Sequence, residues 1–325
     1  MNRIARVNDA AVASGLAFVT GELEKLDSEL RKPLGQVSYA RDVEIISGDG
    51  GWYETLSSYN VDYSISGGVG NLFGGVQNAI ARIQANLSKD SIKTTLFQST
   101  MSIKWVDMQM QRITGRNIAD LLEEGTRLVY DRYLDRAVYK GFPEKGITGL
   151  VNSSEITAAT VAYNAANTST NWADKTPEEI MKDVNAAIED AWKAAEYDDR
   201  AVPNHILIDP SNYNRLNGTV MTVSGTPGDS SILSYLKRNN LAAALGTELN
   251  IYPCRHCAGA GTGSSERMIV YRNEKRFVDF PLPVDLTRAM TGFNYNDWSI
   301  DTLFASLVGQ VRIHYTQPFV YRDGI

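Results

Sequence analysis

Cysteine, histidine and long apolar runs are scarce in this chain of 325 residues. The only two cysteines, Cys254 and Cys257, are too few for the disulfide framework of a secreted scaffold. No apolar run approaches the ~20 residues that a membrane-spanning helix needs, so we expect no membrane partner. Three histidines offer few bases for a serine or cysteine triad, which narrows the enzyme classes open to the chain.

Positive charge is also in short supply. The chain has 32 Lys and Arg against 38 Asp and Glu, a formal net charge of -6. Proteins that read a nucleic-acid sequence need a basic surface, so this balance excludes them. A composition of 43% hydrophobic and 22% charged residues is ordinary for a globular protein with a sizeable core. Helical and strand patterns alternate without a regular βαβ rhythm, which predicts an α+β fold.

Residues 1–38 contain one amphipathic stretch and no material for a core of their own. From Glu22 to Leu34, leucines recur at helical spacing. A faint likeness to a secretory signal near the N-terminus is broken by polar residues and a glycine. We interpret this segment as an N-terminal arm that docks on something else or stays unpacked.

A glycine-rich segment separates two stretches of β-formers, Tyr53 to Ile65 and Lys93 to Trp105. Five of the nine residues from Gly67 to Gly75 are glycine, which supplies no side chain to a core. We predict a long two-stranded arm over residues 39–106 whose tip contacts a neighbouring molecule; a surface loop is the alternative. The expected contact residues at the tip are Gly67, Gly68, Gly70, Leu72, Phe73, Gly74 and Gly75.

The strongest helical pattern runs from Asp107 to Gly141, with Pro143 just beyond its end. Gly115 is a site for a bend. The apolar residues of this helix form one continuous face. They are Ile118, Leu121, Leu122, Leu128 and Val129.

A capping box predicts the start of the next helix, with Thr176 as N-cap, Pro177 first and Glu179 three residues after the cap. The expected buried face of this helix is Ile180, Val184, Ala187, Ile188, Ala191 and Ala195. A further helix is predicted at Ser230–Leu245. Strands are predicted at His205–Asp209, Glu248–Tyr252, Arg267–Tyr271, Arg276–Phe280 and over residues 310–316.

Cys254, His256 and Cys257 form the one cluster that could carry chemistry. A CxxC pair can be a redox site or half of a zinc site. Pro253 before it and glycines after it argue against a helix that begins here, and no second cysteine pair could complete a zinc site. Gly259, Gly261 and Gly263 form a GxGxG run, but a dinucleotide fingerprint would need glycine in place of Ser264 and a helix after it. We expect no catalytic, cofactor-binding or metal-binding residues, and keep a cytosolic enzyme that uses this segment as an alternative.

The order of these elements resembles the Hong Kong 97-type capsid fold: an N-terminal arm, a glycine-tipped β-arm (the E-loop), a long spine helix, a mixed block and a closing strand. Local motifs support the resemblance. The segment Gly146-Ile147-Thr148-Gly149-Leu150-Val151-Asn152 is similar to the turn that follows the spine helix in such proteins. The runs Thr176–Ile180 and Pro203–Pro210 resemble the opening of the axial domain. The ending from Tyr315 to Ile325 looks like that of a phage-encoded capsid branch often filed as an uncharacterised bacterial family.

The resemblance implies the major capsid protein of a tailed bacteriophage, a structural subunit that self-assembles into hexamers and pentamers of an icosahedral shell around double-stranded DNA. It implies a virion location after assembly in the host cytoplasm, no cofactor, and DNA enclosed without sequence-specific binding. The implied organisation is an N-terminal arm (1–38), the extended β-arm and its base (39–106), the spine helix of the peripheral domain (107–146), the axial domain (147–285) and the closing strands of the peripheral domain (286–325).

Two departures from known relatives matter. Some relatives carry a large N-terminal scaffolding segment; the short segment before the arm implies a separate scaffold protein here, beside a portal. Others lock the shell with a Lys–Asn isopeptide bond from the arm tip, but no lysine occurs between Arg41 and Ser88. An encapsulin-like nanocompartment shell protein is the alternative with the same fold.

Overall fold

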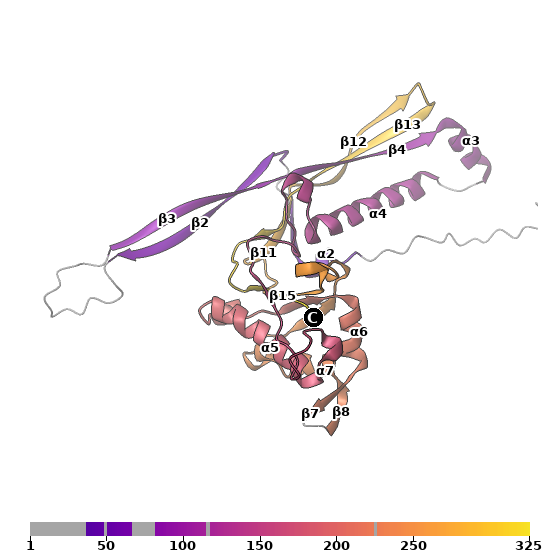
Figure 1. Ribbon diagram of the computed structural model, residues 1–325. Helices are drawn as coiled ribbons and strands as arrows, with labels where there is room; N and C mark the ends of the chain where they lie inside the picture. The colour runs from indigo at the N-terminus through magenta and orange to yellow at the C-terminus, as the bar shows by residue number, and fades with distance from the viewer. Residues whose placement is uncertain (1–36, 49–50, 67–81, 115–117, 224–225) are drawn as a thin grey trace, which may run out of the picture. The chain divides into compact units, whose positions relative to one another are not determined.

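The computed structural model describes residues 37–48, 51–66, 82–114, 118–223 and 226–325 (Figure 1). Helices and strands are mixed along these residues without a βαβ repeat, and the predicted α+β class is confirmed. The predicted N-terminal helix and the glycine tip of the arm lie outside the described residues.

The arm is a two-stranded antiparallel hairpin of β2 (Thr55–Ser66) and β3 (Arg82–Lys93). The strands pair in unbroken register from Thr55 opposite Lys93 to Ser66 opposite Arg82. The first predicted strand is confirmed, but the return strand was wrongly placed at Lys93–Trp105. That stretch is β4 (Thr95–Lys104), which belongs to another sheet. Strand β3 escaped prediction because it consists mainly of polar residues, in keeping with its exposure to solvent.

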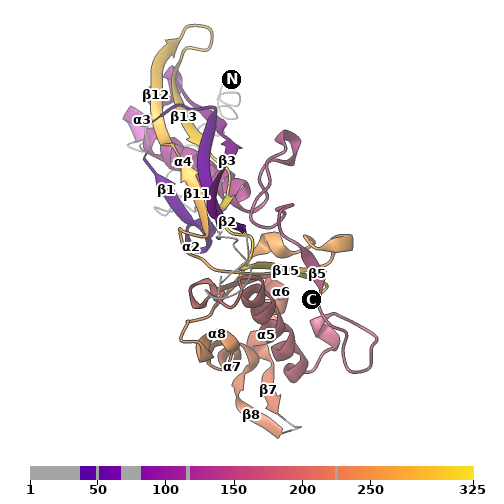
Figure 2. The ribbon, with the colours of Figure 1, turned by 90° about the vertical axis from the view of Figure 1, so that its left-hand side faces the viewer.

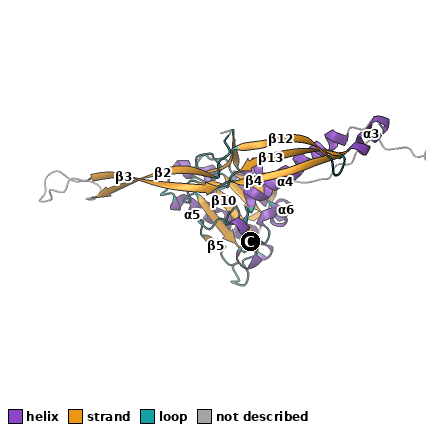
Figure 3. Cartoon of the chain, turned by 90° about the horizontal axis from the view of Figure 1, so that it is seen from above, coloured by secondary structure: helices purple, strands orange, loops and turns teal. Residues whose placement is uncertain are grey.

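Strand β4 forms the edge of a three-stranded sheet with β13 (Ser299–Val308) and β12 (Val284–Asn294). Helices α3 (Trp105–Thr114) and α4 (Ile118–Tyr139) follow β4 directly, and α4 runs alongside the sheet (Figures 1 and 3). A small core of Met101, Ile103 and Phe304 lies at the sheet. The predicted helix corresponds to α3 and α4, and residues 115–117, where the bend at Gly115 was predicted, lie outside the described residues.

The turn after α4 folds back on the end of that helix. The Leu150 and Val151 N–H groups donate to the Val138 and Tyr139 carbonyls, at 2.8 and 3.0 Å. The Asn152 side chain donates to the Lys140 carbonyl, at 3.0 Å, and accepts from the Gly149 N–H, at 2.7 Å. These bonds satisfy carbonyls that a helix end otherwise leaves unpaired, which explains the Gly-Leu-Val-Asn motif.

A five-stranded sheet forms the second body of structure. Its order is β5 (Ala158–Thr160), β15 (Phe319–Asp323), β10 (Arg267–Tyr271), β6 (His205–Ile208) and β9 (Asn250–Pro253). The last strand of the chain therefore pairs with the middle of this sheet, antiparallel to β10. The helices beside it are α5 (Pro177–Ala194), α6 (Pro210–Gly218), α7 (Ile232–Arg238) and α8 (Leu241–Ala244), as Figure 2 shows.

Sequence patterns correctly predict the start and the buried face of helix α5 in this body. The capping box of Thr176 and Glu179 is present, and Ile180, Val184 and Ile188 are buried as predicted. The predicted helix at 230–245 is broken, because Asn240 caps a new helix by accepting from the Ala243 N–H. Helix α6 was missed; it begins at Pro210, which had been read only as the end of a strand. Strands β7 (Val220–Val223) and β8 (Thr226–Ser231) form a small separate hairpin.

A third sheet links these parts. Strand β11 (Val278–Leu282) pairs with β1 (Glu44–Ser47) and with β14 (Arg312–Ile313). Only these two residues of the strand predicted over 310–316 are in β structure. One continuous apolar core joins α4, β11, β15 and the short helix α2 (Tyr39–Asp42). Helix α4, the β11 sheet and the five-stranded sheet are thus anchored around shared buried side chains.

Candidate assembly surfaces

The β2–β3 hairpin has an apolar face that the described part of the subunit leaves open. Tyr59, Val61 and Leu87 are 66%, 47% and 70% exposed. Val61 lies opposite Leu87, and Tyr59 opposite Lys89, so their side chains share one face of the ribbon. We call Tyr59, Val61 and Leu87 the arm face. A two-stranded hairpin is only marginally stable alone in water, so a partner on this face would stabilise it.

The predicted tip residues cannot be placed. Gly67, Gly68, Gly70, Leu72, Phe73, Gly74 and Gly75 all lie outside the described residues. Their role in contact with a neighbour therefore stays a prediction.

Helix α4 carries a second exposed apolar surface. Leu121, Leu122 and Val129, which we call the α4 stripe, are 38%, 37% and 53% exposed. Glu123 bonds Arg288 of β12, at 3.2 Å. Residues two positions apart on a helix do not face the same way, so Leu121 points away from that strand. The apolar face seen in the sequence is real, but these residues of it are not packed inside the subunit.

The buried side of α4 lies nearer its C-terminus. Tyr130, Leu134, Val138 and Tyr139 are at most 4% exposed and belong to the main core. Sequence periodicity did not single these residues out, because two of the four are tyrosines and polar residues intervene.

A third exposed surface, which the sequence analysis missed, lies at the far end of the β12–β13–β4 sheet. Phe293, Tyr295 and Trp298 at the β12–β13 turn are 44%, 81% and 66% exposed. Trp298 has a positive φ of 50°, which is rare for a bulky residue, and its carbonyl accepts from the Trp105 N–H at 2.8 Å. The Asn and Asp residues between the two strands favour a turn, and this pattern could have predicted the hairpin.

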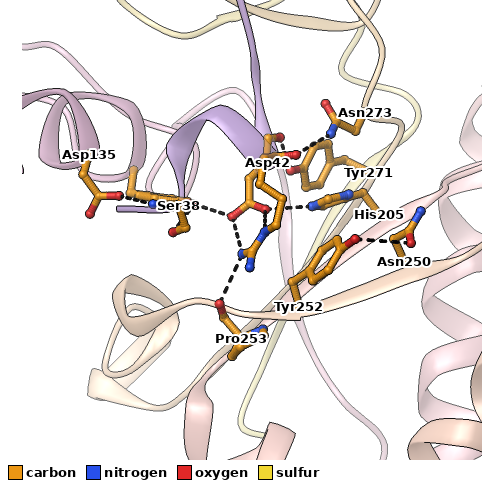
Figure 4. A network of polar contacts seen from close by, with 11 residues as sticks. Ser38, Asp42, Asp135, His205, Asn250, Tyr252, Pro253, Tyr271 and Asn273 are labelled. Atoms are coloured by element: carbon orange, nitrogen blue, oxygen red, sulfur yellow. Dashed lines mark hydrogen bonds and ion pairs between the residues drawn. The ribbon is translucent and has the colours of Figure 1, made fainter. Parts of the chain in front are cut away.

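A buried polar network joins α2, α4 and the five-stranded sheet (Figure 4). The Asp42 carboxylate accepts from Arg41 Nε at 2.6 Å and from the Tyr139 hydroxyl, and lies 3.1 Å from His205 Nε2. The Ser38 N–H donates to Asp135 Oδ1 at 3.1 Å. The network therefore holds α2 against α4 and the five-stranded sheet.

Each of the three histidines contacts a buried aspartate that an arginine also binds. His256 and Arg255 meet Asp135 at 2.9 and 2.7 Å. His314 and Arg312 meet Asp279 at 3.0 and 2.6 Å. Burial alone would raise the pKa of each of these carboxyls, but the hydrogen bonds from histidine and arginine hold the pKa values of Asp42, Asp135 and Asp279 below the ordinary value. The histidines serve here as structural partners of aspartate.

The cysteine segment is packed away from solvent. Cys254 and Cys257 are free thiols, 1% and 0% exposed. Burial raises the pKa of the Cys257 thiol well above its usual value, which disfavours the thiolate that redox or metal chemistry needs. Contrary to the expectation that no helix begins here, residues Arg255–Cys257 form one 3₁₀ turn. Within the described ranges, no three His, Cys, Asp or Glu side chains gather as metal ligands would.

A cleft of about 930 Å³ opens between the arm and the body. Tyr59 and Val61 line it on the arm side, and Lys275, Arg312 and Tyr315 line it on the other. No helix among the described residues has the length and apolar character of a membrane span.

Comparisons with known proteins identify the family of the chain and similar solved structures. The family model described as Major capsid protein matches residues 68–325. The chain belongs to this family. No curated protein matches it.

Solved capsids share the fold at low sequence identity. The capsid of Myoviridae phage XM1 matches with a TM-score of 0.75 and 14% identity, over 94% of this chain and 98% of that one. A structure from Microbacterium phage Oxtober96 matches with a TM-score of 0.62 and 13% identity, over 97% and 99% of the two chains. A virus-like particle from Pyrococcus furiosus matches with a TM-score of 0.50 and 14% identity, over 86% and 89%.

These findings confirm the Hong Kong 97-type capsid fold and a capsid shell subunit, located in the virion. Membership in a structural family also disfavours the enzyme alternative built on Cys254, His256 and Cys257.

Proposed function

We propose that the chain is the major shell subunit of a tailed phage, forming hexamers and pentamers of an icosahedral shell that encloses double-stranded DNA. The observation that carries the proposal is the arm face, an apolar hairpin surface left open within the described subunit. Head-to-tail contact, in which the arm of one copy lies across the next, closes rings without a special end subunit. The net charge of -6 suits a wall that holds DNA without gripping its sequence.

The organisation that we propose follows the expected segments. Residues 1–38 form the N-terminal arm, 39–106 the E-loop and its base, 107–146 the spine of the peripheral domain, 147–285 the axial domain, and 286–325 the closing strands. The tip residues from Gly67 to Gly75 contact the neighbour. A separate scaffold protein and a portal are the further partners.

Purified protein examined by size-exclusion chromatography and negative-stain microscopy tests this function. We expect closed shells or rings of subunits. A compact monomer at micromolar concentration, with its arm protected from proteolysis, would contradict the proposal.

An encapsulin-like shell protein with the same fold is the alternative function. Particles isolated from the native host distinguish the two. We expect nuclease-protected double-stranded DNA inside, whereas a nanocompartment holds a protein cargo. A portal or terminase gene beside this one favours the phage.

A further inference from the structure

We infer that Cys254 and Cys257 are a dithiol that a peroxide closes to a disulfide within the chain, and that this bond locks the turn between them onto helix α4. The chemistry belongs to the single chain and does not depend on shell assembly. Only its timing, after the particle leaves the host cytoplasm, rests on the proposed function.

The two sulfur atoms lie where a disulfide can bridge them. The Cys257 thiol is hydrogen-bonded to the Cys254 side chain. The Cys257 N–H also donates to the Cys254 carbonyl, at 3.2 Å, which closes a tight turn of the backbone. The Cα atoms at the two ends of such a turn lie less than about 7 Å apart, within the reach of a disulfide. The bond can therefore form without rearrangement of the sheet.

The two residues between the cysteines hold this turn on α4. Arg255 Nη2 and His256 Nε2 lie 2.7 and 2.9 Å from Asp135 Oδ2. The His256 ring also stacks on the Tyr139 ring, with the centroids 4.9 Å apart. At the start of the turn, the Cys254 N–H donates to the last carbonyl of β6, at 2.7 Å. The turn thus connects the five-stranded sheet to α4, and a bond between its ends restricts both partners of Asp135.

The oxidation needs only a peroxide. Hydrogen peroxide converts one thiol to a sulfenic acid and leaves one water; the second thiol then attacks that sulfur and the hydroxyl departs as a second water. Two electrons pass from the sulfur atoms to the peroxide. Burial, which raises the pKa of the Cys257 thiol, makes the step slow. Ala258 and Gly259, directly after the turn, are exposed, so local opening at this edge admits a small uncharged oxidant.

Peptide mapping tests the bond directly, because trypsin cleaves between the two cysteines. Purified protein is exposed to hydrogen peroxide without denaturant, thiols are blocked with N-ethylmaleimide, and the chain is unfolded and digested. Cleavage after Arg238, Arg255 and Arg267 puts each cysteine on its own peptide, residues 239–255 and 256–267. We expect the two peptides to be found joined, lighter than their sum by two hydrogen atoms, and to separate on reduction. The oxidised protein should run as a single chain on a non-reducing gel.

The matched control is Cys257→Ala, which should give no joined peptides; Cys254→Ala replaces it if the first variant does not fold. Met290 is 70% exposed, so its oxidation in the same map shows that the peroxide has acted. If treatment is prolonged well beyond that point and both wild-type cysteines still react with N-ethylmaleimide, or carry added oxygen instead of a disulfide, the inference is overturned.

The melting temperature tests the lock on α4. Disulfide closure should raise the melting temperature of wild type by about 2–5 °C relative to Cys257→Ala treated alike. Asp135→Asn should show about half this rise or less, because the two effects share one contact. Asp279→Asn, which alters a similar aspartate outside the turn, should keep the full rise. An equal rise in Asp135→Asn refutes the lock. Arg255→Ala, whose native side chain is 50% exposed, serves if Asp135→Asn does not fold.

Particles test the timing. The cytoplasm keeps thiols reduced, whereas disulfides persist on virions outside the cell. Particles from cells opened in N-ethylmaleimide should carry two blocked thiols per chain, and released particles should carry the disulfide after storage in air or peroxide. Released particles that stay reduced would refute this timing. If no shells form, the proposed function fails, while the peptide map of the purified chain still decides whether the bond forms.

Discussion

The change Gly149→Ala probes the turn that ends helix α4. A Cβ at position 149 would lie 2.4 Å from the Tyr139 carbonyl oxygen and 2.7 Å from the Gly141 nitrogen, both backbone atoms. Forcing such a contact typically costs about 1–3 kcal/mol in backbone shifts. Because Leu150 and Val151 donate to the last carbonyls of α4, a shift also weakens two hydrogen bonds worth about 1 kcal/mol each. We expect the free energy of unfolding to fall by about 3–5 kcal/mol.

Calorimetry on the unassembled subunit measures this effect. A loss of that size should lower the melting temperature by roughly 6 °C or more, since about 2–4 °C is lost per kcal/mol in proteins of 150–250 residues. Gly125→Ala, also in the α4 region, is the matched control. A Cβ there meets nothing within 4 Å, and alanine is favoured over glycine in a helix by about 1 kcal/mol, so the melting temperature should rise slightly. The reasoning is refuted if Gly149→Ala melts within about 1 °C of wild type.

Three further predictions concern charge and covalent chemistry. Asp279→Asn should lower the urea midpoint of unfolding at neutral pH. The pKa of Asp279 is depressed in the folded state, so its stabilisation is present above the ordinary value of 3.8 and is lost as pH falls through the folded-state pKa. The midpoints of variant and wild type should therefore converge in acid. A gap of undiminished size at about pH 2 would contradict this assignment. Changing both Cys254 and Cys257 to alanine should lower the free energy of unfolding by about 1–3 kcal/mol through lost packing. Elemental analysis should find the same metal content in variant and wild type. Stoichiometric zinc in the wild type that is lost in the variant would show a metal site. Particles boiled in denaturant and reductant should run as single chains, because no lysine occurs between Arg41 and Ser88; a ladder would reveal a covalent lock.

Features with a local chemical cause could be predicted from the sequence. The capping box at Thr176 works through atoms three residues apart, so the residues themselves encode it. Strand β6 is equally legible, because His205–Ile208 is buried on every side and bounded by prolines. The turn after α4 could be recognised as a motif, but its role in capping the carbonyls of α4 depends on the three-dimensional structure.

Features that depend on partners far away in the chain could not be predicted from the sequence. Strand β4 reads as the mate of β2, yet it pairs with β13 some two hundred residues later, and nothing local in β4 distinguishes the two partners. The Asp42 network draws His205 and Tyr271 from strands far along the chain. Single charged residues such as Asp42 and Asp135 look solvated in a sequence, because only the fold brings the arginine and histidine that make their burial tolerable.

The arm face and the α4 stripe show why hydrophobic periodicity overstates burial in a shell subunit. The pattern in a sequence records which side chains are dry in the functional state, and for this chain we propose that this state includes neighbours. Leu121 and Val129 look like core residues by spacing, yet they are 38% and 53% exposed in the described subunit. Burying a side chain of that size in an assembled shell would contribute roughly 1.5–3 kcal/mol. The same exposed groups make an unassembled subunit prone to wrong contacts, so a separate scaffold protein that guides assembly is the expected companion of this surface.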